Sequence, residues 1–437
     1  MTKLPIMRAA TVILAGGLLA GTLSSCAATD TSDAPKLTYW ASNQGRTLDD
    51  DQRILGESLA RFTEATGVEV ELEVIPWSDM YNRMLTAVSS GEGPDVINVG
   101  NTWSVGIQDT GSFVSFDEDA AEQIGGLDRF VDANLSATGA AGKPPAALPL
   151  YGLAYSLYYN ASVFEAAGLE PPQTWEEMVD IAHQLTVDTD GDGQIDQWGL
   201  SITGNRPVAN THMAFALGLR HGSELYDDEG NPTFTDDGIV KATMQWIDLM
   251  ASGVVDPAVA EYDTVAQVQD DLMLGRAAMI IDQNPHNAFA ARDFTDWANI
   301  ALPSFETLPA GGIDIATHVS GINVAVFKNS DNLDAALALA KFLTDDEQVF
   351  LASSYGLLPV DRTAADAPEF DEEWIKVKQE TLENHSAPMP LYSSEGQAEI
   401  LIGQAIGQLF GKIAVGGTVT EADVREALES AQASLAK

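Results

Sequence analysis

Residues 68–74 alternate strictly between apolar and acidic side chains, in the order Val-Glu-Val-Glu-Leu-Glu-Val. A period of two predicts a β-strand with one buried face and one exposed face. The preceding segment, residues 49–66, carries its apolar residues at helical spacing and is followed by Gly67. This pattern predicts a helix that ends at the glycine.

Three further segments extend this pattern toward both sides. Residues 37–40 and 95–99 are short apolar runs that predict strands, and residues 78–90 predict a second helix, capped by Ser78 and stopped by Gly91. The resulting order, β-α-β-α-β, is typical of an open and largely parallel α/β sheet. Ligands of such sheets bind beyond the carboxyl ends of the strands.

Polar and aromatic side chains follow two of these predicted strand ends. We expect them to form a ligand-binding edge, made of Trp40, Ser42, Asn43, Gln44, Asn101, Thr102 and Trp103. Trp103 has two interpretations, because an indole after a polar Gly-Asn-Thr loop can stack on a ligand or pack into the core.

The middle and the end of the chain repeat the α/β character. A Gly-, Ala- and Pro-rich stretch at 139–149 predicts a crossing between two lobes. The segments beyond it predict strands at 155–159, 198–202 and 322–327, a hairpin at 225–235, and helices at 174–185, 238–252, 331–343 and 421–436.

The N-terminal segment indicates the compartment. Lys3 and Arg8 precede an apolar run at 9–23, which is too short to span a bilayer of about 30 Å and predicts a signal peptide. The tetrapeptide Leu-Ser-Ser-Cys that ends at Cys26 resembles a bacterial lipobox. The resemblance implies a signal peptide at 1–25, lipid on Cys26, and a small, polar tether at 26–35 that holds the exported protein on the outer face of the cell membrane.

Composition and charge narrow the possible partners. The chain has 437 residues, enough for two or three domains, and carries 65 acidic against 22 basic residues for a net charge of −43. A surface this negative excludes nucleic acid as a partner and favours a monomer kept apart by self-repulsion. Cys26 is the only cysteine, which excludes an internal disulfide and a thiolate-rich metal site.

Common catalytic motifs are absent from the sequence. It contains no GxSxG, HExxH, Walker or GxGxxG motif, and its histidines never fall at i, i+4. A glycosidase needs only two carboxylates at the right separation, so a chain with 65 acidic residues leaves that alternative open.

Five short motifs, taken together and in order, resemble family 1 extracellular solute-binding proteins, the ligand receptors of carbohydrate ABC importers. The resemblance runs from about Leu37 to the end of the chain. The motifs are Gly-Glu-Gly-Pro-Asp-Val at 91–96, the stretch 159–177 with Phe-Glu-Ala-Ala-Gly-Leu and Thr-Trp-Glu-Glu, Leu-Gly-Arg-Ala-Ala-Met at 274–279, the stretch 321–343, and Gly-Leu-Leu-Pro-Val at 356–360.

The resemblance implies a two-lobed, periplasmic-binding-protein-like fold of type II, the Venus flytrap, with interleaved α/β lobes and a hinge. Lobe 1 is expected at 36–146 plus 302–349, and lobe 2 at 147–301 plus 350–437. The ligand is expected to be a mono- or oligosaccharide bound in the cleft and delivered to membrane-embedded ABC permease subunits. Aromatic faces, amides and carboxylates suit the apolar faces and hydroxyls of sugars.

By position, the second lobe and the crossing segments add further candidate ligand-binding residues. They are Asn205, Arg206, Asp282, Gln283, Asn284, His318, Ser320 and Tyr392. The family's common Gly-Pro-Trp near position 282 is replaced here by Asp-Gln-Asn-Pro-His. The stacking tryptophan expected there is missing, which argues against a long malto-oligosaccharide-type subsite.

An acidic loop at 188–196 follows the spacing of an EF-hand calcium loop. Its candidate ligands are Asp188, Asp190, Asp192, Gln194 and Asp196. Position twelve of the pattern is Gly199 rather than a bidentate Glu, so an ion there needs water or a distant ligand. The alternative is a solvated turn. We expect a structural Ca²⁺ and no cofactor for function.

Two alternatives to a carbohydrate receptor remain open. One is a surface-anchored glycan hydrolase or adhesin. The other is a receptor for a non-sugar solute such as a glycerophosphodiester, for which the candidate loops offer only Arg206 as a phosphate partner.

Overall fold

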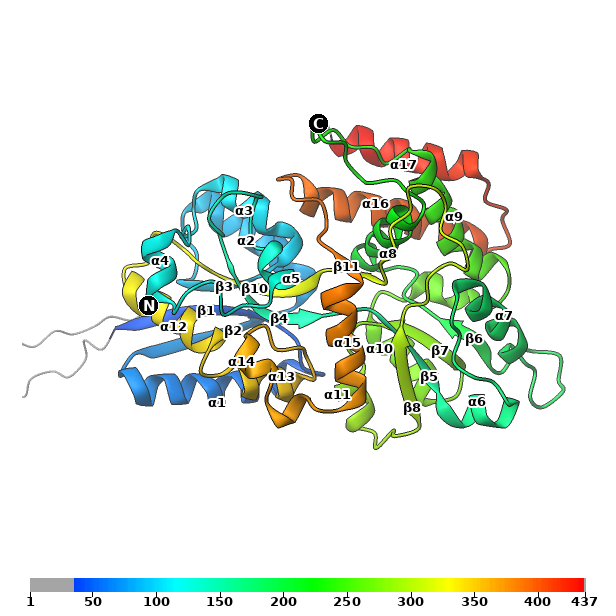
Figure 1. The fold of residues 1–437 in the computed structure, drawn as a ribbon, viewed down its shortest axis with the longest axis horizontal. Helices are drawn as coiled ribbons and strands as arrows, with labels where there is room; N and C mark the ends of the chain where they lie inside the picture. Colours follow the sequence, from blue (N-terminus) through cyan, green and yellow to red (C-terminus); the bar gives the residue numbers. More distant parts are fainter. Residues whose placement is uncertain (1–34, 436–437) are drawn as a thin grey trace, which may run out of the picture. The chain divides into compact units, whose positions relative to one another are not determined.

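The computed structural model describes residues 35–435. Its largest sheet has five strands in the order β2-β1-β3-β10-β4 (Figure 1). Strands β1 and β2, and likewise β1 and β3, are parallel, whereas β10 runs antiparallel to both of its neighbours. The strands are β1 (Lys36–Ser42), β2 (Glu69–Ile75), β3 (Val96–Gly100), β4 (Leu148–Leu153) and β10 (Ser320–Val326). We call this sheet and the elements packed on it lobe 1.

Local sequence accounts for the first elements of lobe 1. Strand β2 lies at the sheet edge, and its glutamates are exposed while the alternate apolar residues are partly covered, as the period of two predicts. Thr47 is the N-cap of the helix that precedes β2, because its side chain accepts a hydrogen bond from the Asp50 amide. Gly67 ends the same helix in the left-handed conformation, at φ 75°. The expected cap at Ser78 is wrong, because the second helix begins at Trp77 with Pro76 before it.

Helices cover both faces of the lobe 1 sheet. They are α1 (Leu48–Thr66), α2 (Trp77–Ser90), η1 (Asn101–Trp103), α3 (Ser104–Thr110), α4 (Glu118–Gln123), α5 (Asp132–Ser136), α12 (Leu333–Thr344), α13 (Gln348–Tyr355) and α14 (Arg362–Ala365). One apolar core joins α1, α4, α12 and α13 to the sheet, and a second joins α2, η1 and α3 to it.

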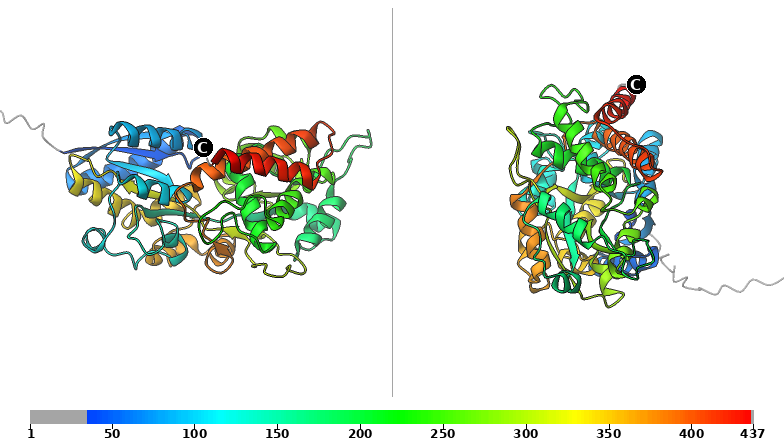
Figure 2. Two further views of the ribbon diagram at one scale, coloured as in Figure 1. Left: turned by 90° about the horizontal axis from the view of Figure 1, so that it is seen from above. Right: turned by 90° about the vertical axis from the view of Figure 1, so that its right-hand side faces the viewer.

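The second sheet has four strands in the order β6-β7-β5-β8, and we call it and its covering elements lobe 2. The strands are β5 (Ser156–Asn160), β6 (Trp198–Ser201), β7 (Ala277–Asp282) and β8 (Trp297–Ala301). Its helices are α6 (Ala161–Ala167), α7 (Trp175–Leu185), α8 (Pro207–Arg220), α9 (Asp237–Ala251), η2 (Pro257–Glu261), α10 (Val265–Met273), α11 (His286–Ala290), α16 (Glu395–Ala414) and α17 (Glu421–Leu435). Helices α16 and α17 lie side by side (Figure 2).

The lobes are interleaved, but the structure differs from the expected boundaries at three places. The segment 302–316 was expected in lobe 1 but packs into the lobe 2 core through Leu302, Phe305 and Ile315. Strand β4 pairs with β10 in the lobe 1 sheet, although residues from 147 onward were expected in lobe 2. Helix α13 belongs to lobe 1, because Leu351 and Tyr355 pack into its core, although residues from 350 onward were expected in lobe 2. Helix α14 also lies in lobe 1, since Asp361 at its start pairs with Arg129. The expected hairpin at 225–235 contains only a single bridge, between Tyr226 and Pro232.

Two crossing segments join the sheets, and a third leads from α14 of lobe 1 to α16 of lobe 2; together they form the hinge region. One runs from the end of β4 to the start of β5, and the other passes through β9 (Thr317–His318) into β10. Strand β9 pairs with β11 (Ser386–Ala387). Between the lobes, η3 (Pro368–Phe370) precedes α15 (Glu373–Asn384), which packs on β8 of lobe 2 and α5 of lobe 1 (Figure 1). Within residues 35–435, no helix is both long and apolar enough to span a membrane.

Candidate ligand-binding site

A cavity of about 220 Å³ lies where strand ends of the two lobes meet. Its lining comes from both lobes and from the crossing segments. The lining residues are Asn43, Gln44, Gly45, Trp77, Gly100, Asn101, Thr102, Leu153, Arg206, Val208, His212, Val265, Asp282, Gln283, Asn284, His318, Ser320, Gly321, Ile322 and Glu399. The loops after β1, β3 and β7 contribute directly, as the carboxyl-end rule predicts.

Most of the residues that sequence reasoning selected line this cavity. They are Asn43, Gln44, Asn101, Thr102, Arg206, Asp282, Gln283, Asn284, His318 and Ser320. The cavity lining does not include Trp40, Ser42, Trp103, Asn205 or Tyr392.

Trp103 is only 5% exposed, because it packs into a lobe 1 core and against α16 of lobe 2. Its ring stacks on Trp77 at a centroid distance of 4.7 Å and touches Tyr81 at 4.9 Å. Gly100 and Gly396 make room for the indole, because a Cβ on either would come within 3.0 Å of it. Of the two interpretations, the structure therefore supports core packing.

The other residues outside the cavity make local contacts. Trp40 lies beneath the guanidinium of Arg83, 4.4 Å from it, and the Ser42 hydroxyl accepts from the side chains of Gln44 and Asn98. The Tyr392 hydroxyl donates to the Asp227 carbonyl. The Asn205 amide donates to the carbonyl of Tyr262.

The lobe 1 wall holds an indole that sequence reasoning missed. Asn43 accepts a hydrogen bond from the Trp77 amide at 2.7 Å, which fixes the start of α2 against the loop after β1. The amides of Gln44 and Gly45 donate to one carboxylate oxygen of Asp51, at 3.0 and 2.8 Å. Trp77 follows the end of β2, so the carboxyl-end rule could have found it had it been applied to that strand.

The lobe 2 wall combines a buried carboxyl group with a cation. Asp282 accepts from the Gln269 side chain at 2.8 Å and from the Asn284 amide at 2.9 Å, and burial raises the pKa of its carboxyl group. The guanidinium of Arg206 lines the cavity and has no ion-pair partner within residues 35–435. It is therefore available to a ligand.

Sequence reasoning also missed a buried cluster between the two walls. His212 Nε2 lies 2.6 Å from Glu399 Oε1, and His212 Nδ1 lies 3.2 Å from the Tyr155 hydroxyl. The rings of His212 and His318 are 3.8 Å apart. Burial lowers the pKa of His212 to about 3 and raises the pKa of Glu399 to about 7. The only signal in the sequence was a pair of glutamates, 395 and 399, in a helix with no other charged residue before Lys412.

Several hydrogen bonds join lobe 1 elements to lobe 2 or to the crossing segment, among them the bond from the Asn284 side chain to the Tyr355 carbonyl of α13 at 2.9 Å. Thr102 donates to Glu399 Oε2 at 3.1 Å, and the Asn101 side chain donates to the Val319 carbonyl at 2.7 Å. The Gln283 side chain donates to the Ser320 hydroxyl at 2.6 Å. Residues that line the cavity thus also link the parts that a hinge would move.

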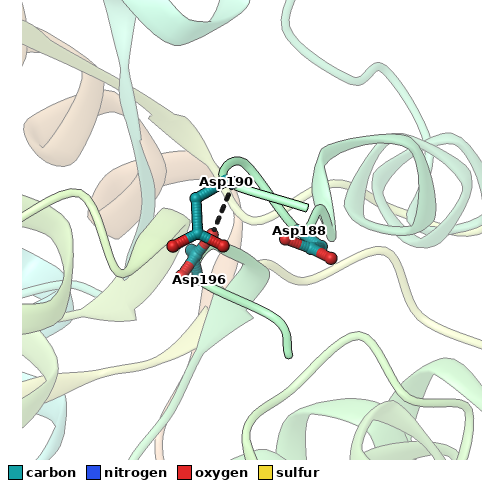
Figure 3. A group of neighbouring side chains, drawn as sticks. All are labelled: Asp188, Asp190 and Asp196. Atoms are coloured by element: carbon teal, nitrogen blue, oxygen red, sulfur yellow. Dashed lines mark hydrogen bonds between the residues drawn. The ribbon is translucent and has the colours of Figure 1, made fainter. Parts of the chain in front are cut away.

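The acidic loop at 188–196 lies on the surface, away from the cavity. Oxygens of Asp188, Asp190 and Asp196 lie within 4.8 Å of one another, and all three residues are exposed (Figure 3). This spacing fits oxygens around one Ca²⁺, whose ligands lie about 2.3–2.6 Å from the ion. Asp192 is outside this group, and its carboxylate accepts from the Gln194 amide.

Known proteins resemble the chain along most of its length. A putative binding protein of Brucella abortus is 24% identical over 305 residues, which cover 69% of this chain and 71% of the relative. The diacetylchitobiose binding protein DasA of Streptomyces coelicolor is 25% identical over 331 residues, 74% of this chain and 72% of the relative.

A solved structure and a family profile add to this likeness. The GacH receptor of Streptomyces glaucescens, whose structures include a complex with acarbose, superposes with a TM-score of 0.75 at 20% identity and covers 92% of this chain and 98% of its own. Residues 47–350 match the profile of the bacterial extracellular solute-binding proteins. The chain therefore belongs to the bacterial extracellular solute-binding protein family, with the two-lobed fold that the sequence motifs imply.

Proposed function

We propose that this protein captures a carbohydrate in the cavity between its lobes and delivers it to an ABC importer. The observation that carries the proposal is the cavity lining, in which side-chain amides, two carboxyl groups and one guanidinium surround a single indole. Such a lining matches a ligand with many hydroxyls and an apolar ring face. The names of DasA and of the GacH complex, which state sugar or sugar-like ligands, support the same ligand class.

The proposed mechanism is reversible binding coupled to lobe closure. A ligand that contacts both walls binds the closed form more tightly than the open form and shifts the equilibrium toward closure. In this scheme the bonds from Thr102 to Glu399 and from Gln283 to Ser320 stabilise the closed form. No bond of the ligand is broken in this scheme, which distinguishes the receptor from a glycan hydrolase.

A thermal-shift panel tests the ligand class. Diacetylchitobiose, maltotriose and mannotriose are compared with glycerophosphocholine, a glycerophosphodiester. A rise in the melting temperature with at least one sugar supports the proposal, because a ligand that binds only the folded state stabilises it by mass action. Recovery of that sugar intact after long incubation excludes hydrolysis. Stabilisation by glycerophosphocholine alone would contradict a carbohydrate ligand.

We extend the proposal to the attachment of the protein. Cys26 lies outside the described residues, and the lipobox-like sequence that ends at it supports lipid attachment on the outer face of the cell membrane. Cys26→Ser should release the protein into the medium or leave it unprocessed, without the mass increase of a diacyl group. The charge of −43 supports a monomer, which sedimentation would test.

We also propose that the loop at 188–196 holds a structural Ca²⁺. The convergence of three carboxylates supports it, because hard oxygen ligands suit this ion. The loop also hydrogen-bonds internally, since Asp196 accepts from the amide and hydroxyl of Thr189 at 2.7 Å. A solvated turn is the alternative, and chelation distinguishes the two.

A further inference from the structure

Glu399 lies in the cavity wall at the boundary between the two lobes. It projects from α16 of lobe 2, lines the cavity, and accepts from Thr102 of lobe 1. Tyr155 and His318 of the cluster lie on the two crossing segments between the sheets. The carboxyl group therefore contacts both lobes directly at the cavity wall, and it reaches the crossing segments through His212.

The hydrogen bonds around Glu399 define its role as an acceptor. An ionised carboxylate only accepts, so His212 Nε2 carries the proton in the 2.6 Å contact. His212 Nδ1 then accepts from the Tyr155 hydroxyl, which keeps its proton because burial raises its pKa. The chain Tyr155–His212–Glu399 thus fixes the orientation of the carboxylate, which forms part of the cavity wall.

Each element that packs against Glu399 carries a charged or titratable group near it. They are Glu395 on the same helix, His212 on α8, Arg206 before α8, Tyr155 and His318 on the crossings, and Tyr81 on α2. Burial raises the pKa of Glu395 and of both tyrosines and lowers that of both histidines, so the tyrosines and histidines are neutral near pH 7. Arg206 is always charged.

We infer that Glu399 is a specificity-determining acceptor for ligand hydroxyls, held in place by His212, and that binding is linked to its loss of a proton. The inference rests on the proposed function. Hydroxyl donors stabilise the ionised form, so a bound sugar lowers the pKa of Glu399, which burial raises to about 7. Affinity is then greatest above pH 7 and weakens on acidification, by up to about tenfold per pH unit.

Variants of the chain separate this role from simple packing. Glu399→Gln removes the titrating group but keeps its shape. Glu395→Gln is the matched control, because Glu395 lies one turn away, is fully buried and does not line the cavity. His212→Phe keeps a ring against His318 but loses the N–H donor, whereas His212→Gln retains a donor and should rescue function.

Calorimetric titration from pH 5.5 to 8.5 provides the first test. The probe is diacetylchitobiose or maltotriose, whichever stabilises the wild type more in the thermal panel. We expect proton release on binding near pH 7, a roughly ten- to hundredfold weaker and pH-independent affinity in Glu399→Gln, and an affinity in Glu395→Gln that still depends on pH. His212→Phe should weaken binding while His212→Gln restores most of it. A pH dependence that persists in Glu399→Gln would overturn the inference.

Difference infrared spectroscopy of the carboxyl stretch tests the same cluster without any ligand. Wild type minus Glu399→Gln should show one carboxyl group that ionises near pH 7, and His212→Phe should move that midpoint upward because a donor is lost. An ordinary midpoint in the wild type, or one that His212→Phe leaves unmoved, refutes the inference. If the carboxyl group ionises near pH 7 but no sugar binds, the proposed carbohydrate function is wrong, whereas the hydrogen bonds described around Glu399 are confirmed.

Discussion

Alanine substitutions of Trp103 and Trp77, whose indoles stack on each other, should separate an effect on stability from an effect on sugar binding. Trp103 is 5% exposed and packs on two aromatic rings, so Trp103→Ala removes a core side chain and should lower the free energy of unfolding by about 3–5 kcal/mol. Trp77 is partly exposed and lines the cavity. Trp77→Ala should lower stability by only about 1–2 kcal/mol but weaken sugar binding by about 2–4 kcal/mol, or roughly 30- to 1000-fold.

The assay measures both quantities on the same preparations. Guanidinium unfolding followed by circular dichroism gives stability, and calorimetric titration with the sugar that the thermal panel selects gives affinity. Trp40→Ala is the matched control, because this partly buried indole lies outside the cavity against Arg83 and should leave affinity unchanged. A Trp103→Ala protein that unfolds like the wild type yet fails to bind sugar would refute the assignment of Trp103 to the core.

Three further perturbations test other parts of the structure. Arg220→Met should lower the free energy of unfolding by about 3 kcal/mol or more, because the buried carbonyls of Leu302, Pro303 and Ile315 lose their hydrogen-bond donor. Wild-type stability of this variant in chemical unfolding would contradict those contacts. Burial lowers the pKa of Lys378 to about 7, so folding releases its proton and stability should rise with pH from about 7 to 10, by at most about 1.4 kcal/mol per pH unit. That rise should vanish in Lys378→Met, and its persistence would show that another group causes it. Calcium should raise the melting temperature of the wild type and not of Asp190→Ala, whereas a melting temperature that chelator leaves unmoved favours a solvated turn.

Local sequence patterns were sufficient where the chain's own periodicity decides the structure. The alternation at 68–74 produced β2, and the glycines at 67 and 91 end the first two helices in the left-handed conformation. The carboxyl-end rule found Asn43, Asn101 and Asp282 because it depends only on where strands end.

The missed residues depend on contacts between distant segments. Glu399 and His212 meet because α16 packs on α8, and their separation of 187 positions leaves no local signal. The burial of Trp103 could not be predicted from sequence for the same reason. The space for its indole is made by Gly100 of β3 and Gly396 of α16, which are far apart in the chain. The lobe boundary failed at β4 because strand pairing, rather than the preceding Gly- and Pro-rich stretch, determines lobe membership.

Calorimetric titration of the wild-type protein with diacetylchitobiose, maltotriose and mannotriose, followed by chromatography of the titrated sugar, tests the central claim most directly. The account predicts that one of these sugars binds at one site per chain and is recovered unchanged. Heat from none of them, or fragments of the sugar after the titration, would contradict a reversible carbohydrate receptor.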